Sequence, residues 1–206
     1  MEMKMKNRFS VVGIFIVAVC VVFVLLAGFG VFGIDLPTEY KEQYNCDYKV
    51  ISLNLNVDVV GTNGNDYNIR GEVLSTYEDD LVMKNADGDI VKVTDDKFNF
   101  ISQNNHIIMS GDTVEYICDG QIKIFADSYN IYDADENKVA YVYFNILDTV
   151  GIMKDMAGNE IARYDSAAFR KDYVVTIFDD CEIDSESILM IFGSYVSDKR
   201  ADDSNN

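Results

Sequence analysis

Histidine, cysteine and basic side chains are all scarce in this chain of 206 residues. The single histidine, His106, has no paired Cys or His nearby in the sequence, so the spacing that a zinc site needs is missing. A catalytic histidine also needs a nucleophile and an orienting group, and no Gly-x-Ser-x-Gly turn or similar motif supplies them. The glycines stand singly at expected turns, without a phosphate-binding loop. The sequence therefore predicts no catalytic residue, and the protein is not expected to be an enzyme.

Basic residues number 17 against 35 acidic ones. Lys4, Lys6, Arg8 and Glu2 are the charged residues among the first 34, which leaves 14 basic and 34 acidic residues beyond them and a formal charge of −20. A domain this acidic is repelled by nucleic acid and by anionic lipid surfaces. Nucleic acid is therefore excluded as a partner, and the acidity suits a solvated surface or, more weakly, cation binding.

Cysteine is too rare for a disulfide framework. Outside the apolar N-terminal run there are three, Cys46, Cys118 and Cys181. An odd number cannot pair completely, and about 170 residues can bury a core without disulfides. The sequence leaves open whether any two of them pair. Because all three lie in or beside apolar runs, buried unreactive thiols are the default interpretation.

One long hydrophobic run extends from Phe9 to Ile34 without a charged residue. Its 26 residues exceed the roughly 20 that a helix needs to cross a bilayer and the roughly 7–15 of a cleavable signal. An uncleaved transmembrane anchor is therefore favoured over a removed signal peptide. The basic flank over residues 1–8 should stay in the cytoplasm, which places the main domain outside a single-pass membrane protein.

A polar stalk is expected over 35–45, followed by a domain of short strands over 46–198. Residues Ile51–Val59 alternate apolar and polar side chains, and Asn63-Gly64 is the strongest short hairpin pattern. Asp119-Gly120 is a second two-residue turn. Further strands are expected at Tyr67–Tyr77, Leu81–Lys84, Ile90–Thr94, Phe98–Ser102, His106–Ser110, Thr113–Cys118, Gln121–Ala126, Tyr129–Tyr132, Val139–Ile146, Val150–Lys154, Glu160–Tyr164 and Tyr173–Phe178. This series indicates an antiparallel barrel or sandwich.

The last part of the domain changes to a helical pattern over 184–198. Asp184 is expected to cap this helix, with Ile183 and Ile188 as a hydrophobic staple. The helix is apolar on every side and must be buried all round, and at about 13 residues it is too short to span a bilayer. About twelve strands enclose a lumen too wide for side chains alone to fill, so the barrel interior is the expected place for it. Residues 199–206 are expected to form a disordered tail.

Three turns repeat one polar pattern, at 85–91, 133–140 and 155–162, and the last two align without gaps at an offset of 22 residues. The middle copy is Tyr-x-Ile-Tyr-Asp-x-Asp-x-Asn-x-Val-Ala over Tyr129–Ala140. With these echoes and the apolar terminal helix, the chain resembles the tubby C-terminal-like superfamily, in its LURP-one-related and phospholipid-scramblase-like branches, over residues 65–198. The resemblance implies a mainly β fold: an antiparallel closed barrel of twelve strands around a hydrophobic C-terminal helix, here preceded by one transmembrane helix.

The resemblance implies little about ligands. Tubby-type members bind phosphoinositides through Lys and Arg on the barrel surface, and no basic cluster of this acidic chain matches that site. Scramblase-like members are associated with calcium and membranes, but they carry their membrane segment near the C-terminus. Neither activity is carried over on the resemblance alone.

The residues that come nearest to a calcium loop are Asp133, Asp135 and Asn137, with Asp87 and Asp89 in the first repeat. An EF-hand needs Gly at its sixth position and Glu at its twelfth, and both copies fail this test. Because Asp and Asn in tight turns hydrogen-bond their own backbone, hairpin formation is the favoured interpretation. Calcium is the one cofactor that the sequence leaves open.

The expected function is that of a membrane-anchored, extracytoplasmic, non-catalytic binding or interaction domain of tubby-like barrel type. Its partner would be a protein, a glycan or a lipid, in addition to the membrane that holds the anchor. The alternative is a lipid-interacting, scramblase-like protein that depends on calcium. A specific calcium site would raise the melting temperature of the domain by mass action, which separates the two hypotheses.

Overall fold

A computed structural model describes residues 39–49, 55–71, 81–96, 105–121, 128–145, 148–166, 172–178 and 181–204. The anchor expected over 9–34, its basic flank and the strand expected at Phe98–Ser102 lie outside these residues, as does all but the first residue of the strand expected at Gln121–Ala126. Within the ranges given, no helix has the length and apolar character needed to cross a membrane. The elements are β1 Glu42–Tyr48, β2 Asn56–Gly61, β3 Asp66–Gly71, β4 Leu81–Asn85, β5 Ile90–Asp96, β6 Asn105–Ser110, β7 Thr113–Gln121, β8 Ser128–Asp133, β9 Lys138–Phe144, β10 Val150–Asp155, β11 Glu160–Ser166, β12 Tyr173–Ile177 and α2 Ser185–Ser204.

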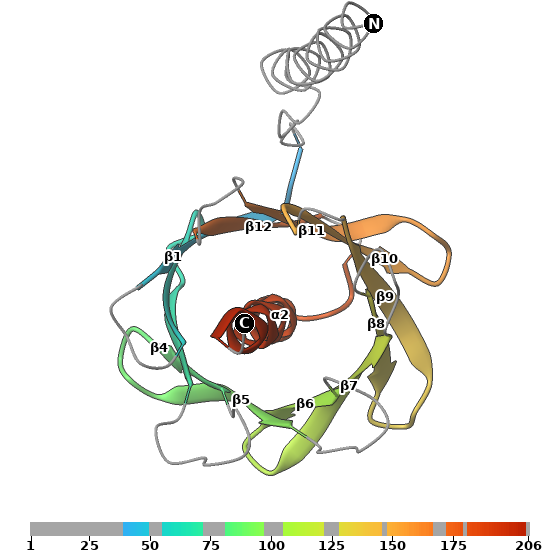
Figure 1. Ribbon diagram of the computed structural model, residues 1–206, viewed down its shortest axis with the longest axis horizontal. Coiled ribbons are helices and arrows are strands. Elements are labelled where there is room, and N and C mark those ends of the chain that lie inside the picture. Colours follow the sequence, from blue (N-terminus) through green and yellow to red (C-terminus); the bar gives the residue numbers. More distant parts are fainter. Residues whose placement is uncertain are drawn as a thin grey trace, which may run out of the picture. The chain divides into compact units, whose positions relative to one another are not determined.

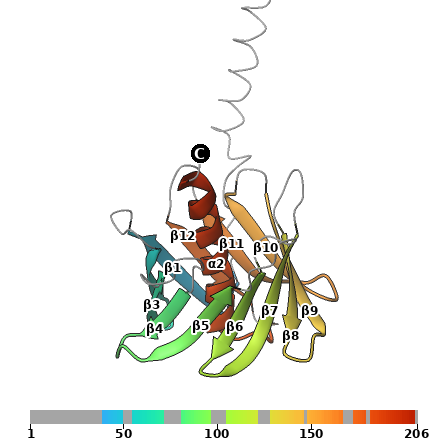
Figure 2. The same cartoon turned by 60° about the horizontal axis from the view of Figure 1, so that its bottom comes forward.

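The twelve strands form a closed barrel in which each strand pairs with its sequence neighbours, and β12 closes the ring by pairing with β1 (Figure 1). Every pair is antiparallel, so consecutive connections alternate between the two ends of the barrel. The tight turns after β2, β4, β6, β8 and β10 share one end (Figure 2). The chain passes from β12 into α2 at this same end, because Ile177 pairs with Ala162 next to the β10–β11 turn. We call this end the mouth; the expected closed antiparallel barrel is confirmed.

Three boundaries differ from the sequence-based expectation. Asp119-Gly120 is not a turn, because both residues pair within β7: Asp119 with Asn105 and Gly120 with Tyr129. Residues 42–45, expected in the stalk, belong to β1. In this strand Tyr44, Cys46 and Tyr48 are buried, and the polar residues between them are exposed. The helix continues to Ser204, so most of the tail expected to be disordered from residue 199 is helical.

Helix α2 lies inside the ring of strands (Figures 1 and 2). It begins as expected: the carboxylate of Asp184 accepts the backbone N–H of Ser187 at 2.9 Å, and Ile183 and Ile188 are both buried. Residues 188–192 are between 0 and 2 % exposed. This stretch has no polar face and is stable here because the barrel wall covers it.

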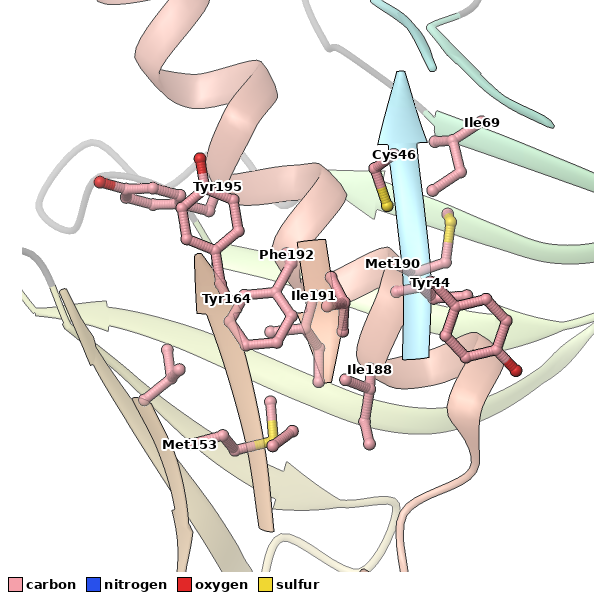
Figure 3. Packing of buried hydrophobic residues seen from close by; sticks show 14 of the residues in the cluster. Tyr44, Cys46, Ile69, Met153, Tyr164, Ile188, Met190, Ile191, Phe192 and Tyr195 are labelled. Carbon is pink, nitrogen blue, oxygen red and sulfur yellow. The ribbon is translucent and has the colours of Figure 1, made fainter. Parts of the chain in front are cut away.

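The helix lies closest to one side of the barrel, over β3–β6. Gly193 lies at this approach, where a Cβ would be in van der Waals contact with Cδ1 of Ile69 at 3.4 Å. Aromatic rings fill the wider space on the other side (Figure 3). Phe144 of β9 and Tyr195 of α2 are stacked with ring centroids 3.4 Å apart, and Phe192 lies 5.7 Å from Tyr164. The barrel interior is thus occupied by the chain's own side chains.

Candidate functional site

The three repeated turns of the mouth have one geometry. Each turn spans five residues, over 85–89, 133–137 and 155–159. The first residue donates its backbone N–H to the fifth carbonyl, and the fourth residue donates its N–H to the first carbonyl. The fourth residue has positive φ: 89° at Gly88, 63° at Glu136 and 90° at Gly158. The first residue accepts backbone N–H groups on its side-chain oxygen, as Asn85 does from Asp87 and Asp89. The repeat is therefore a turn-forming unit, as the favoured interpretation of these residues predicts.

The carboxylates considered for calcium are used within these turns or point outward. Oδ1 of Asp133 accepts the N–H groups of Asp135 and Asn137 at 3.0 and 2.8 Å. The hydrogen bond from the Asn137 side chain lowers the pKa of Asp133. Asp87, Asp89 and Asp135 are exposed. No three His, Cys, Asp or Glu residues of the described ranges are gathered where they could hold a metal ion.

All three cysteines of the barrel are buried free thiols, and no two of them pair. Burial raises the pKa of Cys118 to about 12 and raises the pKa values of Cys46 and Cys181 as well. The thiolate is the reactive form of cysteine. These thiols are therefore held in their unreactive form, in line with the default interpretation.

His106 joins the barrel wall to the helix. Its Nε2 lies 2.9 Å from Oδ2 of Asp198, and the Tyr129 hydroxyl donates to the same oxygen at 2.6 Å. Two further hydroxyls make similar bonds: Tyr67 donates to Glu186, and Tyr195 donates to Asp148. These bonds join residues far apart in the chain, so no local sequence pattern predicts them. They fix both ends of α2 against the wall.

In the described part of the chain, a pocket at the mouth has the form of a ligand-binding cavity. Its volume is about 420 Å³, within the range of small-ligand sites. We call it the mouth pocket, defined by Lys138, Val139, Asp155, Met156, Ala157, Ile161, Glu182 and Ile183. These residues come from β9, from the β10–β11 hairpin and from the segment that leads into α2. No sequence pattern brings three such separate stretches together, so the pocket could not be predicted.

The mouth pocket combines an apolar floor with charged groups. Its apolar lining residues are Val139, Met156, Ala157, Ile161 and Ile183; Ile161 and Ile183 are 3 and 7 % exposed, and Met156 is 57 % exposed. The ammonium group of Lys138 lies 5.3 Å from the ring centroid of Tyr141, a residue that does not line the pocket.

The two carboxylates of the mouth pocket differ in their partners. Asp155 accepts both the backbone N–H and the side-chain amide of Asn159 at 2.8 Å, and the side-chain bond lowers its pKa. Glu182 is exposed and makes no hydrogen bond or ion pair to the part of the chain that the structure describes. Asp155 is therefore held ionised in a fixed place, whereas Glu182 has its full hydrogen-bonding capacity available.

Comparisons with known proteins give the fold and nothing further. The fold defines the class: a closed antiparallel barrel filled by a C-terminal helix. A protein of Arabidopsis thaliana solved by X-ray crystallography is similar, with a TM-score of 0.51 and 13% sequence identity over 80% of this chain and 92% of that chain. No protein-family model and no curated protein matches the sequence.

Proposed function

We propose that the chain is a membrane-anchored, non-catalytic binding module that contacts its partner through the mouth of the barrel. One observation carries this proposal: α2 and the rings around it fill the interior, so a ligand must bind at the outer surface or at an end. The mouth offers a pocket for this purpose. The anchor is the apolar run over 9–34, and the barrel would lie outside the membrane.

We also propose that the barrel is tubby-like, in the LURP-one-related or scramblase-like branch. The repeated turn motif and the apolar terminal helix support this assignment. Twelve antiparallel strands around a C-terminal helix are the architecture that this resemblance implies. The similarity to the Arabidopsis protein supports the fold alone, because the identity is 13%.

The proposal that the module is non-catalytic rests on the burial of its cysteines and of His106. The three thiols are buried with raised pKa values, and His106 is 2% exposed beside Asp198. A nucleophile or general base must reach its substrate. These groups support the packing of the barrel instead.

Vesicle flotation of the full-length chain tests the anchoring. Protein reconstituted with phosphatidylcholine vesicles should float with them after alkaline washing, with or without calcium. The double variant Val21→Lys, Leu25→Lys should stay at the bottom of the gradient, because each central lysine costs roughly 2.5–3.5 kcal/mol in the bilayer. A wild-type chain that fails to float would refute the anchored module.

The same vesicles test the scramblase-like alternative. A fluorescent lipid in the inner leaflet should remain protected from an external quencher when calcium is added. Calcium-dependent exposure of this lipid would show that the chain moves lipids, and it would overturn the binding-module proposal in favour of the alternative.

A further inference from the structure

We propose that the mouth pocket binds a Lys or Arg side chain, together with an adjacent apolar residue, from a partner polypeptide. The aliphatic part of the basic side chain would lie on Val139, Ile161 and Ile183, and its charge would reach Glu182. This inference rests on the proposed function and adds to it the chemistry of the partner.

The charge of the whole mouth favours a cationic ligand. Its five tight turns, 61–65, 85–89, 110–113, 133–137 and 155–159, contain seven carboxylates and no Lys or Arg. The basic residue that lines the pocket, Lys138, has its ammonium group near Tyr141. An excess of negative charge concentrates cationic ligands and repels phosphates and acidic peptides.

The floor of the mouth pocket favours a ligand with an apolar part over a bare cation. Five of its eight lining residues are apolar, and one of them, Met156, is 57% exposed. Lysine and arginine place their methylene stems on apolar surface while the charged head stays in water. Methionine adapts its shape to different partners. A metal ion would gain nothing from such a floor, and the described residues gather no metal-binding cluster.

A polypeptide is the ligand class that combines these features with a cavity of about 420 Å³. A basic side chain followed by an apolar one gives the pocket both an ion-pair partner and a hydrophobic contact. Glu182 supplies the free carboxylate, while Asp155 contributes fixed charge. Specificity for the basic residue then depends on Glu182, and affinity depends on the floor.

Peptide binding to the full-length chain in phosphatidylcholine nanodiscs tests the inference. The probe is a fluorescein-labelled, end-blocked hexapeptide of alternating Lys and Leu, measured by anisotropy at 150 mM salt. Its counterpart of alternating Glu and Leu should not bind. Spermine, a cation without an apolar side chain, should compete only at concentrations far above those of unlabelled peptide.

Two variants locate the site. Glu182→Lys should weaken peptide binding at least tenfold, and Ala157→Phe should do the same without a change of charge, because the ring would fill the pocket. The matched control is Asp87→Lys, the same charge reversal at an exposed mouth turn between β4 and β5. β5 and β9 are four strand spacings apart, so Asp87 lies roughly 19 Å away along the ring, beyond the Debye length of about 8 Å. Its effect should stay within about threefold.

Three results would overturn the inference. Equal losses in Glu182→Lys and Asp87→Lys would reduce the effect to the general charge of the mouth. Spermine as effective as the peptide would show that the floor contributes nothing. No binding of the Lys–Leu peptide would remove the proposed ligand, while a chain that still floats with vesicles would leave the anchored module in place. The melting temperature of each variant shows whether it is folded.

Discussion

Replacing Gly193 by alanine should stabilise the barrel, although glycine sits where the helix comes nearest to the wall. A Cβ at this position would lie 3.4 Å from Cδ1 of Ile69, 3.7 Å from its Cγ2 and 3.8 Å from Cδ1 of Leu81. These distances are ordinary van der Waals contacts at the short end of their range. The methyl group therefore fits, with a small adjustment of the flexible end of Ile69.

The magnitude follows from two gains and one loss. Alanine is better than glycine in a helix interior by roughly 0.8–1.0 kcal/mol, and burying one methyl group contributes roughly another 0.8 kcal/mol. The adjustment of Ile69 removes part of this sum. We expect a net gain of about 1 kcal/mol in the free energy of unfolding, which for a domain of this size raises Tm by roughly 2–4 °C.

Thermal unfolding of the full-length chain, followed by near-UV circular dichroism of its tyrosines, measures this change. The chain has 13 Tyr and no Trp, so the signal reports on the rings packed around α2. The control is Gly193→Val, whose branched side chain should overpack the same contact and destabilise by roughly 1–3 kcal/mol. A destabilising alanine would mean that helix and wall lie closer than the structure shows. A harmless valine would mean that α2 does not pack on β3 and β4 at Gly193.

Three further substitutions follow from single contacts, and unfolding of the full-length chain measures each. Glu136→Gly should stabilise by about 0.5–1 kcal/mol because Glu136 has a φ of 63°; an unchanged Tm would contradict this. Tyr195→Phe should cost about 1 kcal/mol, since it removes the 2.6 Å bond to the partly exposed Asp148 but keeps the ring stack; a loss above about 3 kcal/mol would mean that the ring itself has moved. Asp165→Asn should stabilise by about 1–2 kcal/mol above pH 7, because burial raises the pKa of Asp165 from 3.8 to about 6. The folded state then binds its proton more tightly than the unfolded state, so this gain should fall as the pH drops through 6 and vanish below about 4; a gain independent of pH would refute it.

The architecture could be predicted because the turn residues and the alternation of apolar and polar residues agree with the observed turns and buried positions in most of the chain. Asp133 and its equivalents carry the turn chemistry, and the flanking residues alternate as strands must. The helix after Asp184 has no polar face, which leaves a closed barrel as the place to bury it. β1 carried the same alternation in Tyr44, Cys46 and Tyr48, but its polar residues resembled a stalk. Asp119-Gly120 has the composition of a turn, and strand pairing on both sides overrides that local preference.

The candidate site could not be predicted from the sequence because it depends on contacts between segments far apart in the chain. His106 and Asp198 are 92 positions apart, and nothing local to either residue indicates the other. The mouth pocket joins β9, the β10–β11 hairpin and the segment before α2 in the same way. The sequence did place acidic residues in the right turns, but their first role is to satisfy backbone N–H groups.

A closed, filled barrel restricts the ways in which this chain can recognise a partner. Each of the twelve described strands is paired on both sides, so none offers an edge for the addition of a partner strand. The interior holds α2, whose apolar residues would have to leave their contacts before any ligand could enter. What remains is the outer wall and the ends, and at the mouth the described residues bring a partly apolar pocket and a set of carboxylates together. Recognition at the mouth keeps the fold intact, because its turns can change in sequence while Asp, Asn and Gly at the turn positions hold the hairpins.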